Sequence, residues 1–449
     1  MKSTKNRFRI PFCGILIDDW WMSMKKNKVF NFLVEAKRKF IENFKPKNMK
    51  NHDGKSFTRK RRLTIDRMLI LILRGSPFSL QIRLDDFFKD IGHKEEIVSK
   101  QAFSKARTKI DPEVIKESFF QTTSTISQCE DLKLFKGKFR LCAMDGSDIV
   151  LDNAAELLDY FGGSGRNRDC ATAMSSLCYD PLNGYILDAG LYPYGFSERE
   201  AAKNHFSAVA KLPIPKGVQN LYIGDRGYPS KELFAEMIDA GMYFFMRVRR
   251  KFNAEFDFDF PGLEKKVKFK YNNKSYTVRV FHIDLGTGEK ETLVTNVPKK
   301  YISCFEAGEL YFSRWKIETK FESLKNKLEL ENMSGRRVVT TYQDFWAKLD
   351  LANMLSALEF ATNEKIEDNS SDKENIYEKI TNENRMITKF TKRYIEMFVI
   401  KNIDDRLAVF DELVADIIKY PSEIKPDRNT PRKTPRKKKF HDTRKRVLC

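Results

Sequence analysis

The chain has 449 residues, of which 41% are hydrophobic and 32% are charged, a balance expected of a soluble globular protein with two or three domains. Its formal net charge of +20 favours a polyanionic partner, and nucleic acid over a membrane surface, because no long amphipathic basic helix stands out. The longest apolar run near the start, residues 68–73, is far too short to span a bilayer, and no signal-peptide segment follows the basic N-terminus.

Cysteine and histidine usage narrows the possible chemistry. The seven cysteines form no C-x-x-C pair and are odd in number, which predicts a reducing cytoplasm and argues against a disulfide framework or a zinc site. The five histidines are scattered along the chain. We therefore expect any divalent metal to be bound by carboxylates, which suits Mg²⁺ or Mn²⁺.

Residues 1–135 are predicted to be largely helical. One short helix should begin after Ser99 as its N-cap, and it carries Lys100, Lys105 and Arg107. A short capped helix that follows another helix is typical of the recognition half of a helix-turn-helix. A solvated helix with a basic face is an equally good interpretation.

From residue 136 the hydrophobic period changes to that of strands. Strand patterns occupy residues 138–144, 173–179 and 185–191, with a hairpin turn predicted at 180–184. We expect all three strands to be joined by hairpins. Strand and helix patterns then alternate: a helix from Ser197, a strand at 221–223, a helix at 230–240 and a strand at 243–248. This order predicts a mixed sheet with helices on its faces.

The C-terminal half begins with alternating aromatic and β-branched residues. They predict a small all-β insertion at 250–300, with turns at 272–273 and 286–288. A long helix should follow to about Leu330, and residues 341–420 are again helical in pattern. The segment from 421 to 449 is rich in Pro, Lys and Arg and should be disordered when free.

Two aspartates end apolar runs in this region. Asp145 lies in Met-Asp-Gly-Ser and Asp225 in Gly-Asp-Arg-Gly. Strand ends of such a sheet point side chains into a shared crevice, and Gly146 and Gly227 allow the backbone to approach a substrate. Each aspartate taken alone is more often a cap or turn residue.

A third acidic residue lies on the predicted long helix. Tyr311, Arg314, Glu318 and Lys325 are spaced by three, four and seven, so they should share one helix face. A carboxylate among phosphate-binding groups suits a metal held beside a DNA strand. Three carboxylates gathered together would repel one another unless cations neutralised them.

These residues carry a resemblance to a known family. Asp145, Asp225 and Glu318, with the spacing Y-x₂-R-x₃-E-x₆-K from Tyr311 to Lys325, resemble the DDE transposases of the insertion-sequence family-four group. Weaker likenesses lie at 101–107, at 197–201 with His205, and at 330–335. The resemblance covers roughly residues 60–360.

The resemblance implies a fold and a site. The fold would be an RNase H-like α/β domain: a mixed sheet with flanking helices, an all-β insertion before the last catalytic helix, and helical N- and C-terminal regions. Two Mg²⁺ (or Mn²⁺) ions would be held by Asp145, Asp225 and Glu318. Tyr311, Arg314 and Lys325 would grip phosphates of the transferred strand.

Further DNA contacts are expected around that site. Arg247 and Arg249 alternate on one strand face, where phosphate contact and a solvated edge are equally expected. In relatives that cleave through a DNA hairpin, an aromatic residue stacks on a flipped base. The insertion offers Phe256, Phe258, Phe260 and Tyr271, although alternating aromatics in a strand are more often core residues.

The domain organisation follows from these elements. We expect a helical DNA-binding region at 1–135 and a catalytic domain in two parts, 136–249 and 301–362, separated by the β insertion at 250–300. A C-terminal helical region should follow at 363–420, and a basic tail at 421–449.

The function implied is that of a DNA transposase. It would bind terminal inverted repeats as a homodimer on double-stranded DNA, cleave the transposon ends and join them to target DNA, in the bacterial cytoplasm near the nucleoid. The alternatives are an inactive or domesticated DNA-binding relative, and a nuclease of the same fold without strand transfer.

Overall fold

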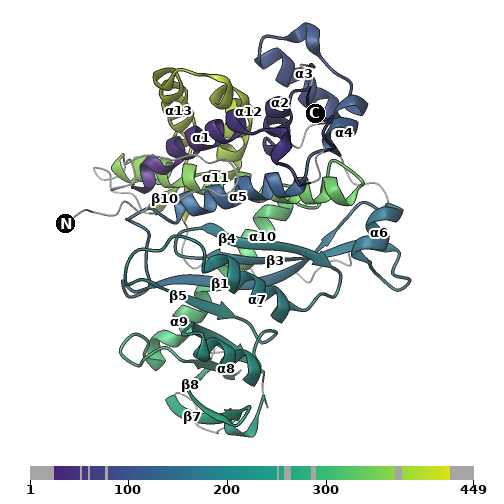
Figure 1. Ribbon diagram of the computed structural model, residues 1–449. Coiled ribbons are helices and arrows are strands. Elements are labelled where there is room, and N and C mark those ends of the chain that lie inside the picture. Colours follow the sequence, from purple (N-terminus) through teal and green to yellow (C-terminus); the bar gives the residue numbers. More distant parts are fainter. Residues whose placement is uncertain are drawn as a thin grey trace, which may run out of the picture. The chain divides into compact units, whose positions relative to one another are not determined.

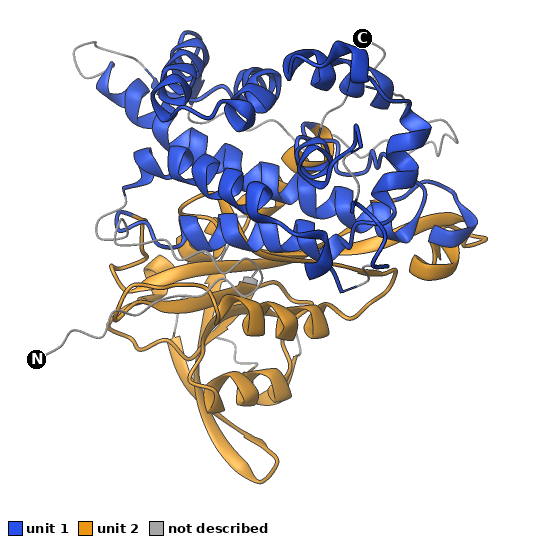
Figure 2. Cartoon of the chain, turned by 45° about the horizontal axis from the view of Figure 1, so that its top comes forward, with its two compact units in different colours: residues 1–131, 151–157, 327–449 blue, residues 132–150, 158–326 orange. Residues whose placement is uncertain are grey.

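The computed structural model describes residues 25–50, 53–58, 61–75, 79–249, 252–256, 264–284, 290–369 and 377–424. The chain divides into two compact units: residues 1–131, 151–157 and 327–449 form the first, and residues 132–150 and 158–326 form the second (Figure 2). The first unit is mainly helical and the second is built around a sheet (Figure 1). The basic tail from 425 onward, Phe258, Phe260 and the turn expected at 286–288 lie outside the described residues.

Five strands form the centre of the second unit: β1 (Phe139–Val150), β3 (Cys170–Asp180), β4 (Tyr185–Pro193), β5 (Gln219–Gly224) and β6 (Tyr243–Val248). They lie in the order β4-β3-β1-β5-β6, with β3 antiparallel to both of its neighbours, β1 and β4, and with β5 and β6 parallel to β1. Three antiparallel strands continued by two parallel strands are the RNase H-like arrangement. The prediction of a mixed α/β sheet is therefore confirmed.

The connections of the first three strands differ from one another. The hairpin at 180–184 is confirmed: the Asp180 carboxylate accepts hydrogen bonds from the backbone N–H of Leu182 and Asn183, and Gly184 adopts a φ of +74° that suits glycine. The prediction of a hairpin between β1 and β3 was wrong, because α6 (Ala155–Phe161) and the short β2 (Gly163–Ser164) intervene. Strand β1 also runs six residues beyond the predicted end, since its pairing with β3 continues to Val150.

Two helices follow the strands as predicted: α7 (Glu198–Val209) and α8 (Lys231–Asp239). Helix α7 is fastened to the sheet by His205, which is fully buried. Its Nε2 lies 2.8 Å from Ser176 Oγ on β3, and its Nδ1 lies 2.6 Å from Asp188 Oδ2 on β4. A buried polar chain of this kind rigidifies the packing because every member finds a partner.

The predicted β insertion consists of β7 (Glu264–Tyr271), β8 (Lys274–Asp284) and β9 (Lys290–Thr295). These strands extend the main sheet, because β9 pairs with β6. The expected turn at 272–273 is present, with φ values of +46° and +60°. Phe256 lies in the short helix η3 (Ala254–Phe256) and is buried against Phe234 and Phe269, as a core residue would be.

The long helix expected around Glu318 is two helices, α9 (Cys304–Ser313) and α10 (Lys316–Asn326). Ser303 and Glu306 form a capping box at the start of α9. At the junction, the N–H of Arg314 bonds to the carbonyl of Tyr311, and that of Ile317 to the carbonyl of Arg314. These three-residue hydrogen bonds tighten the chain between the two helices.

The first unit is organised around α11 (Val338–Asp368), a helix of 31 residues with buried side chains on most of its circumference. A helix that is buried all round belongs in a core. The other helices of this unit are α1 (Lys26–Asn43), α2 (Ile65–Leu73), α3 (Leu80–Asp90), α4 (Lys100–Arg107), α5 (Pro112–Ile126), α12 (Glu383–Val399) and α13 (Ile403–Ile418), with the short helices η1 (Pro46–Asn48) and η2 (Lys94–Glu96) and the small ribbon β10 (Glu378–Ile380) and β11 (Ser422–Ile424). In the described part of the chain, no helix has the length and apolarity needed to cross a membrane.

A buried ion pair joins three of these helices. Lys37 Nζ of α1 lies 2.6 Å from Asp350 Oδ2 of α11, and both side chains are almost fully buried. Ser118 and Thr122 of α5 donate their hydroxyls to the same carboxylate. The Asp350 charge is therefore compensated by one cation and two hydroxyl donors.

Loss of one member of this pair should be costly. Lys37→Met leaves the Asp350 carboxylate without its cation, and we expect it to lower the free energy of unfolding by about 3–5 kcal/mol. Urea denaturation of the full chain measures this. The control is Lys39→Met on the same helix, whose exposed pair with Glu35 should contribute less than about 1 kcal/mol. Equal losses in the two variants would contradict the assigned role of the Lys37–Asp350 pair.

Candidate active site

The register of two neighbouring strands places Asp145 and Asp225 level with each other. Strands β1 and β5 are parallel, and their last pair is Ala143 with Ile223. Asp145 and Asp225 each follow that pair by two residues. Because side chains alternate along a strand, residues two apart point to the same side of the sheet. The parallel register therefore brings both carboxylates to one edge of the β1–β5 pair.

Each aspartate is oriented by its own backbone. The N–H of Gly146 donates to Asp145 Oδ1 at 3.1 Å, and the N–H of Gly227 donates to Asp225 Oδ1 at 2.8 Å. The pKa of Asp145 is raised to about 7, because burial, Asp225 and Glu318 raise it more than Arg314 and the Gly146 N–H lower it. A positive charge placed beside this carboxyl group would favour its ionised form.

Glu318 reaches the same place through Arg314. It lies in the first turn of α10 and accepts a hydrogen bond from Arg314 Nη2 at 2.9 Å. The Nη1 atom of the same guanidinium lies 3.7 Å from Asp145 Oδ2. One buried cation thus lies between two of the three predicted carboxylates.

The ring of Tyr311 packs against the guanidinium of Arg314. Its ring centre is 5.6 Å from Arg314 Cζ, and its side chain packs into the hydrophobic core of the sheet. Only 3% of Tyr311 is exposed, so the phenol is placed to hold Arg314 rather than to face solvent.

The donor set fits a divalent cation. Asp145, Asp225 and Glu318 offer oxygen ligands, which Mg²⁺ and Mn²⁺ prefer. Within the described residues, three ligand atoms within 4.8 Å of one another occur only in the group of His93, Glu95 and Glu96 of the first unit. The three predicted carboxylates are more widely spaced than that. Wide spacing is compatible with two ions about 3.5–4 Å apart, because the outer ligands then contact different ions.

The ammonium group of Lys325 forms hydrogen bonds to strand β1 of the same unit. Its Nζ donates to Ser147 Oγ at 2.7 Å and to the carbonyl of Asp148 at 2.6 Å. It therefore links the end of α10 to the outer half of β1. It is only partly buried, so the ammonium stays close to solvent on the site's side of β1.

The remaining predicted cations fall into two groups. Arg249, Lys100 and Lys105 are exposed. Arg247 forms an ion pair of 2.7 Å with Glu291, which accounts for its position on β6. The interpretation of this strand as a solvated edge was wrong, because β6 pairs with both β5 and β9; Arg249 lies just beyond the end of β6 at Val248.

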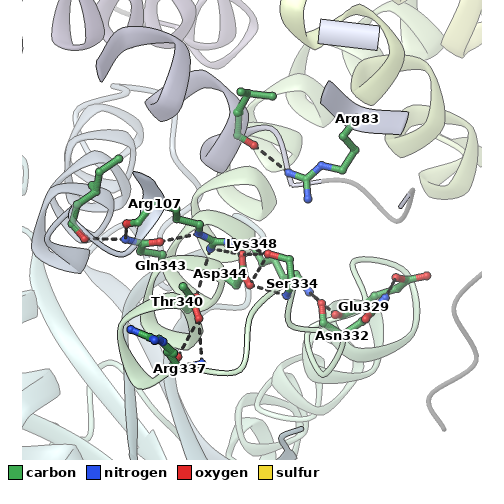
Figure 3. Close-up of polar contacts among 12 residues, drawn as sticks. Arg83, Arg107, Glu329, Asn332, Ser334, Arg337, Thr340, Gln343, Asp344 and Lys348 are labelled. Atoms are coloured by element: carbon green, nitrogen blue, oxygen red, sulfur yellow. Dashed lines mark hydrogen bonds and ion pairs between the residues drawn. The ribbon is translucent and has the colours of Figure 1, made fainter. Parts of the chain in front are cut away.

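Arg107 has a different environment from its neighbours on α4. It is 4% exposed, and its guanidinium contacts Asp344, Gln343 and the Thr340 carbonyl of α11 (Figure 3). Its hydrogen-bonding capacity is used in the interior of the first unit. We therefore leave Arg107 out of the DNA contacts proposed below.

A fourth carboxylate, that of Glu198, lies close to Asp145 and Asp225, although it was not predicted as a site residue. Glu198 lies in the first turn of α7, and its Oε1 would be 3.4 Å from a Cβ atom placed on Gly146. A Cβ on Gly227 would overlap Glu198 Oε2 and lie 3.1 Å from Asp225 Oδ1. Burial, followed by the charge of Asp225, raises the pKa of Glu198, and Arg249 lowers it. From the sequence, Glu198 was recognised only as part of the segment 197–201 that carries a weak family likeness.

Comparisons with known proteins bear on this region. No curated protein matches the chain. A solved structure described as "Cryo-EM structure of piggyBac transposase synaptic complex with hairpin DNA (SNHP)" is similar over 90% of this chain and 80% of that one, at 9% identity and a TM-score of 0.40, which is a weak likeness. Residues 136–354 match the family model described as "Transposase DDE domain". The segment that contains Asp145, Asp225 and Glu318 is therefore similar to the transposase DDE domain.

Proposed function

We propose that this protein is a DNA transposase that uses Asp145, Asp225 and Glu318 to bind divalent metal and to cut DNA at the ends of its element. The observation that carries the proposal is the level placement of Asp145 and Asp225 on adjacent parallel strands, with Glu318 joined to Asp145 through Arg314. The similarity of residues 136–354 to the transposase DDE domain supports the same conclusion.

The chain's own residues would divide the work. Asp145, Asp225 and Glu318 would hold two Mg²⁺ or Mn²⁺ ions, whose chemistry when bound is to activate the attacking oxygen and to stabilise the leaving one. Arg314 holds Glu318 in place and limits the repulsion between Glu318 and Asp145. The N–H groups of Gly146 and Gly227 fix the orientation of the two aspartates.

DNA would be bound by cations that are exposed or only partly buried. Arg249 and Lys325 lie around the carboxylates, Lys100 and Lys105 lie on α4 of the first unit, and the net charge of +20 favours a polyanion. We infer that the partners are the transposon ends and target DNA, and that the chain acts as a homodimer. Joining of the cleaved 3′ ends to target DNA distinguishes this proposal from a nuclease of the same fold.

Each acidic residue should be needed for cutting. We expect Asp145→Asn, Asp225→Asn and Glu318→Gln to abolish Mg²⁺-dependent cleavage of a duplex that carries the element's terminal sequence, because each removes an anionic metal ligand. DNA binding measured by fluorescence anisotropy should persist, because the exposed cations remain. Glu322→Gln, an exposed position on α10, is the matched control. Full cleavage by Glu318→Gln would show that the assignment of α10 to the site is wrong.

The two basic residues near the carboxylates should behave differently. Lys325→Ala should reduce the slope of log binding constant against log salt by about one phosphate contact. Arg314→Ala should leave that slope unchanged and still abolish cleavage, because the buried guanidinium orients Glu318. Titrations at several salt concentrations, each paired with a cleavage assay, measure both effects. A wild-type slope in Lys325→Ala would leave Lys325 only as a link between α10 and β1.

A further inference from the structure

A glutamate outside the expected triad meets both aspartates. Glu198 Oε1 lies against Gly146, the residue after Asp145, and Glu198 Oε2 lies against Gly227, two residues after Asp225. The contact at Gly227 is the closer one: a Cβ there would overlap Oε2, whereas a Cβ on Gly146 would be in ordinary contact with Oε1. The Glu198 carboxylate therefore fits into a gap between the two segments that carry the aspartates.

The position of Glu198 is fixed by two other residues of α7, Arg199 and His205. Next to it, the guanidinium of Arg199 donates to the carbonyls of Tyr228 and Pro229, in the loop that follows Asp225. Seven residues further on, and hence on the same helix face, His205 is hydrogen-bonded to Ser176 and Asp188. Helix α7 is thus held against the sheet while its first turn faces the aspartates.

A buried hydroxyl adds an independent observation. The Tyr228 side chain is fully buried, and its hydroxyl has no hydrogen-bond partner at bonding geometry in the structure. Ser176 interacts with this hydroxyl, and Asp145, Glu198 and Asp225 are close enough for it to experience their charges. A buried hydroxyl without a well-formed hydrogen bond is costly. A ligand with bound water in the space between these carboxylates would provide the partner.

We propose that Glu198 is a fourth metal-binding carboxylate, which supplies an oxygen ligand, together with Asp225, to one of the two divalent cations of the site. This inference rests on the proposed function, because it assigns a further ligand to the same site. Three acidic side chains around two glycines form a set of hard oxygen donors, which suits Mg²⁺ or Mn²⁺. The alternative role is favourable interaction with the α7 dipole at its N-terminus, which requires negative charge but no particular reach.

The test measures Mn²⁺ binding to the full-length protein without DNA, by electron paramagnetic resonance of the free aquo ion. We expect Glu198→Gln to weaken Mn²⁺ binding at least about tenfold, as loss of a group that ligates or orients a metal does. Glu198→Asp should weaken it nearly as much, because the charge remains but the side chain is one methylene shorter. Glu200→Gln, in the same helical turn and exposed, is the matched control and should bind as wild type does.

The outcomes separate this inference from the proposed function. Wild-type affinity in Glu198→Gln, or in Glu198→Asp while Glu198→Gln is weakened, would overturn the ligand role of Glu198. Asp225→Asn in the same assay reports on the site itself. Loss of binding in Asp225→Asn with wild-type binding in both Glu198 variants would reject only the role of Glu198. Absence of Mn²⁺ binding by the wild-type protein would reject both proposals.

Discussion

The electrostatic repulsion between carboxylates gathered where β5 ends beside β1 is the constraint on which the rest of the second unit depends. Parallel pairing puts Asp145 beside Asp225, and α7 and α10 add Glu198 and Glu318. Such a cluster is unfavourable in the folded protein unless positive charge is present. Arg314 supplies part of that charge from the interior. A divalent cation would supply the remaining positive charge. Because its binding would relieve the repulsion between the carboxylates, that repulsion would favour metal binding.

Several structural features serve to hold these groups despite the repulsion. Arg314, at the junction of α9 and α10, pairs with Glu318 one helical turn later and also reaches Asp145 on β1. Tyr311 packs beneath the guanidinium, and His205 fastens α7 to β3 and β4. Each contact fixes a side chain that would otherwise move away from its neighbours. A preorganised site of this kind loses little free energy to reorganisation when a substrate binds.

The sequence was sufficient for the parts of this arrangement that depend on local pattern. Alternating apolar residues and the Asp180–Gly184 turn predicted β3, β4 and their hairpin, and the apolar runs before Asp145 and Asp225 predicted strands β1 and β5, although β1 continues past Asp145 to Val150. The helical spacing of Tyr311, Arg314 and Glu318 indicated their proximity. The prediction of a single helix was wrong, because the periodicity of the sequence continues through the junction of α9 and α10. The contacts of Arg314 and Tyr311 near that junction involve distant segments, which local periodicity does not reveal.

The features that were missed depend on contacts between distant segments. Glu198 meets Gly146 and Gly227 only because α7 crosses the strand ends, and nothing in its own neighbourhood distinguishes it from Glu200. Arg107 shares a short basic helix with Lys100 and Lys105, and its burial follows from Asp344, more than two hundred residues later. Likewise, the strands of the insertion could be recognised, but their pairing with β6 could not.

The most direct test of the account is the melting temperature of the full chain against pH, with and without Mg²⁺, for wild type and Asp145→Asn. The folded protein has a pKa of about 7 at Asp145, against an unperturbed value of about 3.9. The metal-free folded state therefore retains a proton that the unfolded chain releases, and its stability falls as pH rises from about 4 to 7. We predict that this fall is smaller in Asp145→Asn, and that Mg²⁺ raises the melting temperature of wild type at pH 8 but not at pH 5, with no effect on the variant. An equal Mg²⁺ effect in both proteins, or none on wild type at pH 8, would contradict a metal site at these carboxylates.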